Sequence, residues 1–324
     1  MKAGKIIWGI IGPGKIAAKF ATSLRHVEDA ELFAVASRSL ERAREFINKN
    51  GGKKAFGSYE EMLQDEEVDV IYIATPHVFH YEHTLLCLQN GKAVLCEKPF
   101  AINRQQVEEM ISTAKEKQIF LMEAMWTPFL PHIKFVIDLI NLGKYGKIKK
   151  LSADFGFNAP FNETGRLFSI KLGGGSLLDI GIYPVFLALH SLGTPEKIEA
   201  KAQLGKTEVD EVCDVIFSYP GGVTAKLHST IVKKTPTVAE FELEKASIRI
   251  SSRWHEPATV TISTPQGAET KSFNVASYGY EYEARHVNEM LRKGRIESDV
   301  MSFKKSLQLI SLLDQIRKEI KLEY

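Results

Sequence analysis

Apolar and polar residues follow two different spacings in the two halves of the chain. In the first 125 residues, short continuous apolar runs alternate with stretches whose apolar residues recur every three to four positions. The runs are typical of strands buried on both faces, and the second spacing is typical of amphipathic helices. Repeated βα units of this kind predict an α/β domain with a doubly wound parallel sheet. Its strands are expected at 5–11, 32–36, 68–74, 94–97 and 119–122, and its helices at 15–26, 79–90 and 104–118.

After residue 125 the spacing changes. A helix is expected at 129–143, and many later runs alternate apolar with polar residues or are rich in β-branched ones. This pattern predicts an α+β domain with a large, mostly antiparallel open sheet. The change of pattern therefore divides the chain into two predicted domains, residues 1–125 and 126–324. The strands are expected at 147–157, 197–204, 211–218, 222–231, 237–243, 246–251, 258–263 and 269–275, and the closing helices at 280–293 and 302–322.

Composition narrows the class of protein. The 324 residues, 44% hydrophobic and 25% charged, suffice to bury two cores. The formal net charge of +2 is spread along the chain, so no block of like charge indicates a nucleic acid or a membrane as partner. Cys87, Cys96 and Cys213 lie in apolar surroundings and are odd in number. They are expected to be reduced core residues of a cytoplasmic protein.

The N-terminus could be mistaken for an export signal. Met1-Lys2 places positive charge before the apolar run Ile6–Ile11, but that run is short and Gly12–Gly14 breaks it. A first buried strand is therefore the better interpretation. No later run approaches the ~18 continuous apolar residues of a membrane-spanning helix.

A glycine-rich turn joins the first predicted strand to the first helix. Gly12-Pro13-Gly14-Lys15-Ile16-Ala17 reads G-x-G-x-x-A, a form of the dinucleotide fingerprint. Gly12 permits the tight turn, Gly14 lets the backbone approach a pyrophosphate, and Ala17 keeps the helix close to the sheet. The N–H groups at the helix start, at Lys15 and Ile16, would bind the phosphates. The motif alone is weak evidence, but here it has the strand–turn–helix context that it requires.

The end of the second strand indicates which dinucleotide binds. An acidic residue there would bind the ribose 2′-hydroxyl of NAD, whereas this chain has Ser37-Arg38 with Arg42 one helical turn later. A guanidinium can pair with a 2′-phosphate, and a serine can donate a hydrogen bond. We therefore favour NADP, with NAD as the alternative. Ser37 or Ser39 could also cap the next helix, and both roles are compatible.

Two further strands end in polar turns. Thr75 and Pro76 follow one buried strand, with His80 shortly after, and Glu97-Lys98-Pro99 ends the next. The carboxyl ends of parallel strands meet at one edge of a sheet, where such folds bind their ligands. The turns at Gly12–Gly14, Thr75–His80 and Glu97–Pro99 are therefore expected to converge on one site, with Glu97 and Lys98 also contacting the dinucleotide. An isolated Glu-Lys-Pro would more often be a strand end with two solvated charges.

These motifs together carry a resemblance that covers essentially the whole chain. The sequence resembles the Gfo/Idh/MocA oxidoreductases, named after glucose–fructose oxidoreductase and inositol dehydrogenase. The resemblance implies an N-terminal Rossmann domain that binds NAD(P), and a C-terminal domain for substrate binding and dimerisation. It also implies a homodimer built face to face on the C-terminal sheet, whose outer face would otherwise be left apolar. The matching residues are Gly12-x-Gly14-x-x-Ala17, Ala74-Thr75-Pro76-x-x-x-His80, and Gly91-Lys92-x-Val94-Leu95-Cys96-Glu97-Lys98-Pro99 with Asn103.

One segment points to a branch of the family. The aromatic-rich run Met122–Pro131 resembles the segment after the last Rossmann strand in trans-1,2-dihydrobenzene-1,2-diol dehydrogenases and NADP-dependent D-xylose dehydrogenases. Its Trp126 is the best supported substrate-contacting residue. Phe155, Arg166 and Trp254 are weaker candidates, and the two aromatic residues are at a spacing where aromatic residues are more often simply core.

The segment Gly173–Pro184 supplies the candidate catalytic pair. Three glycines precede a predicted helix, on which Asp179 and Tyr183 lie four residues apart on one face. They could be a helix-start acid and a core tyrosine. The family pattern Asp-x-x-x-His or Asp-x-x-x-Tyr falls at these positions and carries catalysis, so the resemblance favours the functional interpretation. No His, Cys, Asp and Glu set has metal-ligand spacing.

The expected reaction is reversible hydride transfer between a nicotinamide and a carbinol carbon of a sugar, polyol or cyclic diol. Tyr183 is the expected acid–base group, and Lys98 is expected to favour its phenolate and to stabilise the developing alkoxide. Asp179 would orient this pair. Two alternatives remain at this point: a dinucleotide-binding sensor or co-repressor without turnover, and an enzyme that recycles a tightly held cofactor between two substrates. Retention of Lys98, Asp179 and Tyr183 favours the dehydrogenase.

Overall fold

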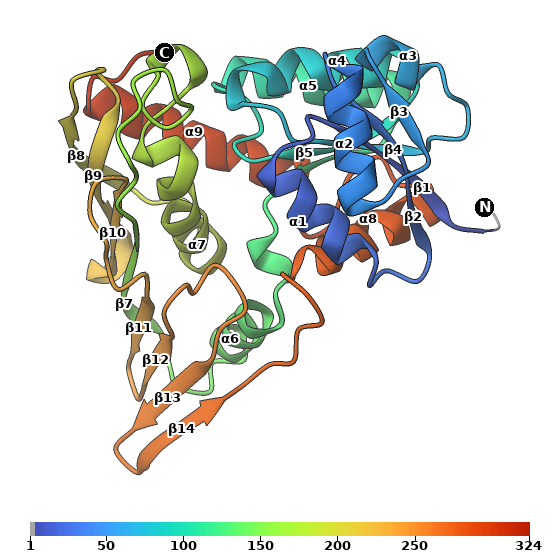
Figure 1. Cartoon of the computed structure of the whole chain (residues 1–324). Helices are drawn as coiled ribbons and strands as arrows, with labels where there is room; N and C mark the ends of the chain where they lie inside the picture. The colour runs from blue at the N-terminus through green and yellow to red at the C-terminus, as the bar shows by residue number, and fades with distance from the viewer. Residues whose placement is uncertain (1–3) are drawn as a thin grey trace. The chain divides into compact units, whose positions relative to one another are not determined.

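A computed structural model describes residues 4–324, so Met1 and Lys2 of the N-terminal interpretation lie outside the described residues. Contacts divide the chain into two units (Figure 1). The first combines the chain up to Trp126 with Val275–Leu307, and the second combines Thr127–Asn274 with Gln308–Tyr324. The predicted boundary near residue 125 marks the first crossing between the units. The contact units differ from the predicted domains 1–125 and 126–324 in one respect, because residues 275–307 group with the first unit.

The first unit contains a six-stranded parallel sheet in the order β3-β2-β1-β4-β5-β6. The order reverses direction between β1 and β4, which is the switch point of a doubly wound sheet. The strands β4 and β5 are entirely buried, and β1 is buried except at Ile7, as their continuous apolar runs predict. The strands are β1 Ile6–Ile11, β2 Ala30–Ala36, β3 Lys54–Phe56, β4 Val70–Ile73, β5 Ala93–Glu97 and β6 Leu121–Ala124.

Helices follow the strands of this sheet. Ser39, Ser58 and Asn103 each accept a hydrogen bond from a backbone N–H in the first turn of the next helix, which fixes where α2, α3 and α5 begin. Right-handed crossovers place α1 and α2 on one face of the sheet and α4 and α5 on the other. The helices are α1 Lys15–Leu24, α2 Leu40–Asn50, α3 Tyr59–Leu63, η1 His77–Phe79, α4 His80–Gln89 and α5 Arg104–Lys117.

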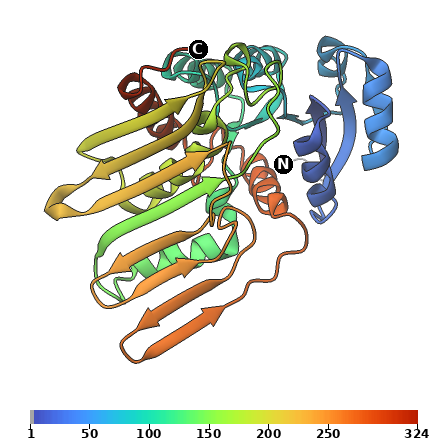
Figure 2. The same ribbon diagram turned by 60° about the vertical axis from the view of Figure 1, so that its left-hand side comes forward.

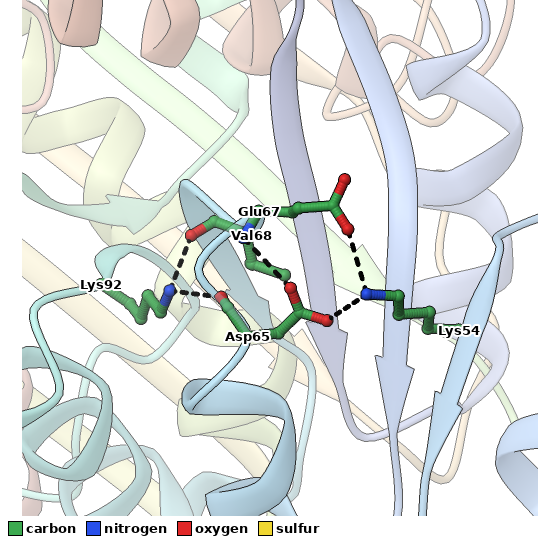
Figure 3. A network of polar contacts seen from close by, with 5 residues as sticks. All are labelled: Lys54, Asp65, Glu67, Val68 and Lys92. Carbon is green, nitrogen blue, oxygen red and sulfur yellow. Dashed lines mark hydrogen bonds and ion pairs between the residues drawn. The ribbon is translucent and has the colours of Figure 1, made fainter.

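A polar network fixes the turn that leads into β4 (Figure 3). Lys54 Nζ lies 2.8 Å from Asp65 Oδ2 and 3.0 Å from Glu67 Oε2. Lys92 Nζ donates to the carbonyl oxygens of Asp65, at 2.6 Å, and Val68, at 3.0 Å. Two lysines, Lys54 on β3 and Lys92 just before β5, thus hold one turn. They thereby set where β4 begins.

The helix α8 (Tyr280–Arg292) explains the return of the chain to the first unit. Trp8 Nε1 on β1 donates to Asn288 Oδ1 at 3.1 Å, and Asn288 Nδ2 donates to Asp29 Oδ1 at 2.9 Å. Arg292 Nε also donates to Asp29, at 3.0 Å. Because these partners belong to the Rossmann sheet and its α1–β2 turn, α8 completes the first unit.

The second unit contains an eight-stranded sheet in the order β14-β13-β12-β11-β7-β10-β9-β8. Only β7 and β10 pair in parallel, and the other neighbours are antiparallel, so the predicted mostly antiparallel sheet is confirmed. The strands are β7 Ile148–Gly156, β8 Lys197–Leu204, β9 Asp210–Ser218, β10 Thr224–Thr230, β11 Ala239–Leu243, β12 Ser247–Ile250, β13 Val260–Thr264 and β14 Gly267–Lys271.

The two faces of this sheet differ. In Figure 2 the helices α6 and α7 lie behind the sheet, while its other face is open within the unit. Along β9 to β12 the residues alternate between buried apolar and exposed positions. The expectation of an apolar outer face was wrong, because period-2 alternation places mostly polar side chains there. They include Asp214, Lys226, His228, Glu240, Glu242 and Arg249, beside the apolar Ile216.

The helices of the second unit include an irregular one. The segment that was expected to form one helix from Ser176 begins as a π-helical turn, η4 (Leu177–Gly181), and continues as α7 (Ile182–Leu192). The stretch Ile170–Leu192 is long and apolar enough to cross a membrane by length and composition alone. However, 94% of its most apolar window is buried inside the structure, as in a core helix. The remaining helices are η2 Thr127–Phe129, α6 Pro131–Asn141, η3 Ile170–Leu172 and η5 Pro220–Gly222, together with α9 Phe303–Glu319, which begins in the first unit and continues in the second from Gln308.

Candidate functional site

The turn after β1 requires glycine at its first position. Gly12 has φ +86°, and a Cβ there would lie 2.8 Å from Thr75 Cγ2 and 2.9 Å from the carbonyl carbon of Ala74. The Gly12 N–H donates to Ala36 O at 3.3 Å. Only a residue without a side chain can occupy this position, because the ends of β1, β2 and β4 meet around it.

The start of α1 is open to an anion. Gly14 caps the helix with an extended backbone and no side-chain hydrogen bond, and the first turn contains no acidic residue. A Cβ on Gly14 would meet only Gly12 O, at 4.0 Å. The N–H groups at Lys15 and Ile16 therefore begin a helix whose positive dipole end has no protein side chain competing for it. These residues fit the pyrophosphate of a dinucleotide.

The residues after β2 combine both roles that the sequence left open. Ser37 is buried and its Oγ accepts from the Ser39 N–H at 3.3 Å, while Ser39 Oγ accepts from the Arg42 N–H at 3.3 Å and caps α2. Arg38 and Arg42 have exposed side chains beside this cap. Their guanidinium groups are therefore accessible to an anionic ligand.

The histidine His83 lies close to Arg38. His83 Nδ1 is 3.0 Å from Thr75 Oγ1, and its ring meets the edge of the Tyr59 ring with 4.8 Å between centroids. Burial lowers the pKa of His83 to about 4, and the positive charges of His80 and Arg38 contribute to this shift. His83 is therefore a neutral group at physiological pH.

His80 joins two of the converging turns. Its ring is completely buried, with Nδ1 2.7 Å from Pro99 O and Nε2 2.8 Å from Thr75 O. A carbonyl oxygen can only accept, so both contacts are hydrogen bonds only when both ring nitrogens carry a proton. Sequence reasoning proposed a cofactor contact at His80 and missed this connection between the β4 and β5 turns.

The turn after β5 brings Lys98 to the same edge. Glu97 Oε1 accepts a short hydrogen bond from Tyr72 Oη, and Oε2 accepts from the Lys98 N–H at 3.3 Å. The Tyr72 ring is stacked on Phe20, with 3.9 Å between centroids, so its hydroxyl has a fixed position. The Lys98–Pro99 peptide is cis and Lys98 is half-buried. Glu97 thus holds the backbone from which the Lys98 side chain projects.

Two more carboxyl groups are buried near this turn. Glu123 on β6 accepts from the Phe100 N–H at 3.1 Å, and burial raises the pKa of Glu123 to about 7. Glu283 on α8 is completely buried, and burial followed by the charge of Glu97 raises its pKa well above the usual range. Sequence reasoning missed Glu283, although it falls on the apolar stripe of α8 with Tyr280 and Val287.

Trp126 is stacked on Tyr280, with 4.3 Å between ring centroids and 17° between planes, and is 3% exposed. Both residues lie in the first unit. The stack fixes Trp126 on the N-terminal side of α8, whereas the other three predicted substrate-contacting residues lie in the second unit.

In the second unit, Asp179 forms a two-point ion pair with Arg166. The atoms Nη1 and Oδ1 are 2.6 Å apart, and Nη2 and Oδ2 are 3.3 Å apart. Asp179 is buried on η4, whereas Arg166 lies on the irregular segment between β7 and η3 and its side chain is 43% exposed. Sequence reasoning predicted both residues separately and missed the pair.

Tyr183 belongs to a cluster of three rings. Its ring centroid lies 5.2 Å from that of His255 and 5.8 Å from that of Phe155. Phe155 and His255 are stacked, with 3.9 Å between centroids. Tyr183 and His255 are buried and Phe155 is half-buried. The cluster brings the predicted acid–base residue and one predicted substrate-contacting residue together.

Trp254 packs against the His255 ring of this cluster. It has no exposed surface, and its Nε1 donates to Asp154 O at 2.9 Å. His132 Nε2 lies 2.9 Å from Trp254 O. The Trp254 ring thus supports His255, which it meets edge-on with 6.0 Å between centroids.

The structure therefore groups the predicted residues by unit. The cofactor candidates gather at the carboxyl edge of the first sheet with Lys98 and Trp126, whereas Asp179, Tyr183, Phe155, Arg166 and Trp254 lie in the second unit. Across residues 4–324, no group of three or more His, Cys, Asp and Glu side chains could hold a metal ion.

Comparisons with known protein families match both parts of the chain. Residues 6–125 match the model of the oxidoreductase family with an NAD-binding Rossmann fold, and residues 133–249 match the GFO/IDH/MocA C-terminal domain. The two matches together cover most of the chain.

Curated relatives match nearly the full length. The chain is 37% identical to trans-1,2-dihydrobenzene-1,2-diol dehydrogenase from Xenopus tropicalis, with 98% of each chain covered. It is 38% identical to the enzyme of that name from Mus musculus, over 97% of this chain and 96% of the other.

Solved structures of oxidoreductases are also similar to this chain over nearly its full length. A 3-ketoreductase from Actinomadura kijaniata, crystallised with NADP and TDP-benzene, has a TM-score of 0.88 at 27% identity, with 98% of each chain covered. An aldose-aldose oxidoreductase from Caulobacter crescentus has a TM-score of 0.90 at 23% identity, also with 98% of each chain covered, and shows the shared fold.

Proposed function

The chain belongs to the Gfo/Idh/MocA oxidoreductase family, and we propose that it is an NADP-dependent dehydrogenase of cyclic diols or sugars. It transfers a hydride between the nicotinamide and the carbon of a CH–OH group. The observation that carries this proposal is the near full-length similarity to dihydrodiol dehydrogenases. The NADP-bound ketoreductase supports the same reaction class.

The first unit is proposed to hold the dinucleotide. The residues present fit this group, because the Gly12 turn excludes any side chain and the start of α1 carries no acid that would repel a pyrophosphate. The exposed guanidinium groups of Arg38 and Arg42 would pair with the 2′-phosphate that distinguishes NADP from NAD. When bound, the nicotinamide supplies the hydride acceptor or donor.

The residues of the chain would manage the proton. In the oxidation direction, the Tyr183 phenolate takes the hydroxyl proton of the substrate while the hydride leaves the carbinol carbon. In reduction, the Tyr183 phenol returns that proton to the carbonyl oxygen. The Lys98 ammonium would favour the phenolate and stabilise the negative charge on the substrate oxygen.

The ion pair with Arg166 sharpens the role of Asp179. A carboxylate held at two points by a guanidinium has a fixed orientation. We infer that the pair anchors the irregular segment that carries Arg166 to the turn that precedes Tyr183. Phe155 and Trp126 would each present apolar surface to a cyclic substrate. Trp254 would support the cluster of rings to which Phe155 belongs.

Two properties of the whole protein also belong to this proposal. The three described cysteines are free and buried, which supports a reducing location such as the cytoplasm. The open face of the second sheet supports a homodimer, and on it a hollow of about 320 Å³ is lined by residues that include Asp214, Lys226, His228 and Glu240. A polar interface of this kind would be held by ion pairs as well as apolar contact.

The direct test is absorbance at the reduced-nicotinamide band. The protein is mixed with NADP and a panel of trans-dihydrodiols, pyranoses and polyols, and the same panel is repeated with NAD. The expected result is NADPH formation with at least one cyclic diol or sugar. Tight NADP binding without turnover on the whole panel would instead indicate a dinucleotide sensor.

A further inference from the structure

A carboxyl group outside the predicted site holds the start of the catalytic turn. Asp210, the first residue of β9, is completely buried. Its Oδ2 accepts from the Leu177 N–H at 2.7 Å and from Ser176 Oγ at 2.9 Å. Leu177 is the first residue of η4, two positions before Asp179. Asp210 therefore binds the backbone at the point where the segment with Asp179 and Tyr183 begins.

The second oxygen of this carboxyl group lies over a glycine. Asp210 Oδ1 is buried and has no hydrogen-bond partner among residues 4–324. A Cβ on Gly175, which has φ +112°, would lie 2.0 Å from this oxygen and 3.3 Å from Tyr324 Oη. Tyr324 Oη donates to Gly174 O at 2.6 Å. The carboxyl group and the tyrosine hydroxyl thus enclose Gly175, next to Ser176.

The other side of the turn is packed against β10. Ser176 Oγ lies 3.0 Å from Ser229 Oγ, and a Cβ on Gly181 would come within 2.7 Å of the same Ser229 oxygen. The π-helical turn is therefore clamped between β9, β10 and Tyr324. Such π-helical turns are frequent at functional sites. A small shift of the turn would move Asp179 and Tyr183 together.

We propose that Asp210 is a positioning residue for hydride transfer, acting through Leu177 and Ser176 on the turn that carries Asp179 and Tyr183. Its ionisation sets how firmly that turn is held, and Tyr324 closes the turn from the side of Gly174. The inference rests on the proposed function for its catalytic consequence. The hold on the turn is independent of that function.

The surroundings of Asp210 make its ionisation relevant near neutral pH. Burial raises the pKa of Asp210 to about 7, against the opposing effect of the hydrogen bonds from Leu177 and Ser176. When Asp210 is ionised, both bonds to Oδ2 are charge-assisted and stronger. When it is neutral, the proton resides on the unpartnered Oδ1, and Oδ2 remains a weaker acceptor. The turn is thus held more firmly above pH 7.

The other ionisable groups around Asp210 do not share this range. Burial and then the charge of Asp210 raise the pKa of both Tyr324 and Cys213 above their usual values, so both stay neutral. Asp179 is paired with Arg166. The Arg317 guanidinium faces the Tyr324 ring at 5.3 Å from its centroid and stays positive. Asp210 is therefore the group expected to titrate in this cluster near neutrality.

The first experiment measures kcat and KM of the full chain between about pH 5.5 and about 9, a range that brackets the expected ionisation. The variants are Asp210→Asn, which keeps an acceptor oxygen but cannot ionise, and Glu208→Gln, which removes an exposed carboxyl two residues away. We expect an inflection in kcat near pH 7 that Asp210→Asn loses, with kcat at high pH lower by about tenfold to a hundredfold. KM for NADP should not change, and Glu208→Gln should match the unmodified chain. An inflection that persists in Asp210→Asn, or disappears in Glu208→Gln, overturns the proposal.

The second experiment needs no turnover. Hydrogen exchange of a peptide spanning residues 174–183 is followed against pH, with correction for the intrinsic base-catalysed rate. Protection of the Leu177 amide should rise above pH 7 in the unmodified chain but not in Asp210→Asn, and Tyr324→Phe should lower it at every pH. Equal protection in the unmodified chain and Asp210→Asn overturns the anchor. A protected, pH-dependent turn in a chain without dehydrogenase activity would instead refute the proposed function.

Discussion

The guanidinium of Arg166 and the carboxylate of Asp179 meet at two points, with Nη1–Oδ1 at 2.6 Å and Nη2–Oδ2 at 3.3 Å. Asp179 is 10% exposed at its side chain, and Arg166 is 43% exposed. A buried carboxylate is thus neutralised by a cation that reaches solvent. The pair joins an irregular surface segment to the turn before Tyr183.

Replacement of Arg166 should affect activity more than stability. The pair is partly exposed, and water screens its charge, so Arg166→Ala should change the free energy of unfolding by only about 1 kcal/mol. Loss of the two-point contact should lower kcat by about tenfold or more, because Asp179 is no longer held. Steady-state kinetics and urea unfolding check the two values. Arg166→Lys keeps the charge but not the two-point geometry, and should also be impaired. Full activity in Arg166→Lys would show that charge alone matters.

Gly175→Ala should strongly destabilise the second unit. Its φ of +112° is unfavourable for alanine, and the new Cβ would lie 2.0 Å from Asp210 Oδ1. We expect a loss of at least about 2–3 kcal/mol in the free energy of unfolding. Gly143→Ala is the matched control, since Gly143 has φ +65° with nothing within 4 Å of the added Cβ. That variant should lose only about 1 kcal/mol. Equal losses would argue against crowding at Gly175.

The Glu123 carboxyl should make stability depend on pH. Burial raises its pKa from 4.5 to about 7 in the folded state, so the folded chain binds more protons than the unfolded chain between these values. The contribution of this group is therefore favourable below pH 4.5 and is lost as the pH rises towards 7. Glu123→Gln cannot ionise, so its stability relative to the unmodified chain should rise by about 1–3 kcal/mol across this range. Urea unfolding at several pH values measures the difference, and a constant difference would contradict the assignment.

The preference for NADP should depend on Arg38. Arg38→Ala removes a charge-assisted contact to the 2′-phosphate. It should therefore raise KM for NADP by about tenfold to a hundredfold and leave KM for NAD nearly unchanged. Arg44→Ala is a suitable control, because Arg44 is exposed on α2, the helix that begins two residues after Arg38. Steady-state kinetics with both cofactors check this prediction. A proportional rise with NAD would place Arg38 elsewhere than at the 2′-phosphate.

The sequence predicted the features that depend on local pattern. Gly12 and Gly14 follow a strand and open a helix, and Lys98 ends a strand, so periodicity and turn chemistry place them at one edge of a parallel sheet. The resemblance to the family singled out Asp179 and Tyr183. Residues that act through long-range packing left weaker signals. Glu283 was visible only as a charge on the apolar stripe of α8.

Asp210 left no signal. It stands in the mostly polar run Lys206–Glu211, and its buried contact with the start of η4 joins residues far apart in the chain. The contact between Arg166 and Asp179 was equally hidden, since the segment with Arg166 has no regular spacing. The return of 275–307 to the first unit depends on pairs such as Trp8 and Asn288, which are far apart in the chain.

The most direct test of the account is the rate of NADPH formation by Lys98→Ala, measured with an oxidisable cyclic diol or sugar alongside the Kd for NADP. Lys98 is proposed to stabilise the substrate oxygen and the Tyr183 phenolate, while the pyrophosphate is held by the Gly12–Ile16 turn. We expect turnover to fall by about a hundredfold or more. The Kd for NADP should stay within about threefold of its original value, since most phosphate contacts remain. Turnover close to that of the unmodified chain would contradict the proposed mechanism.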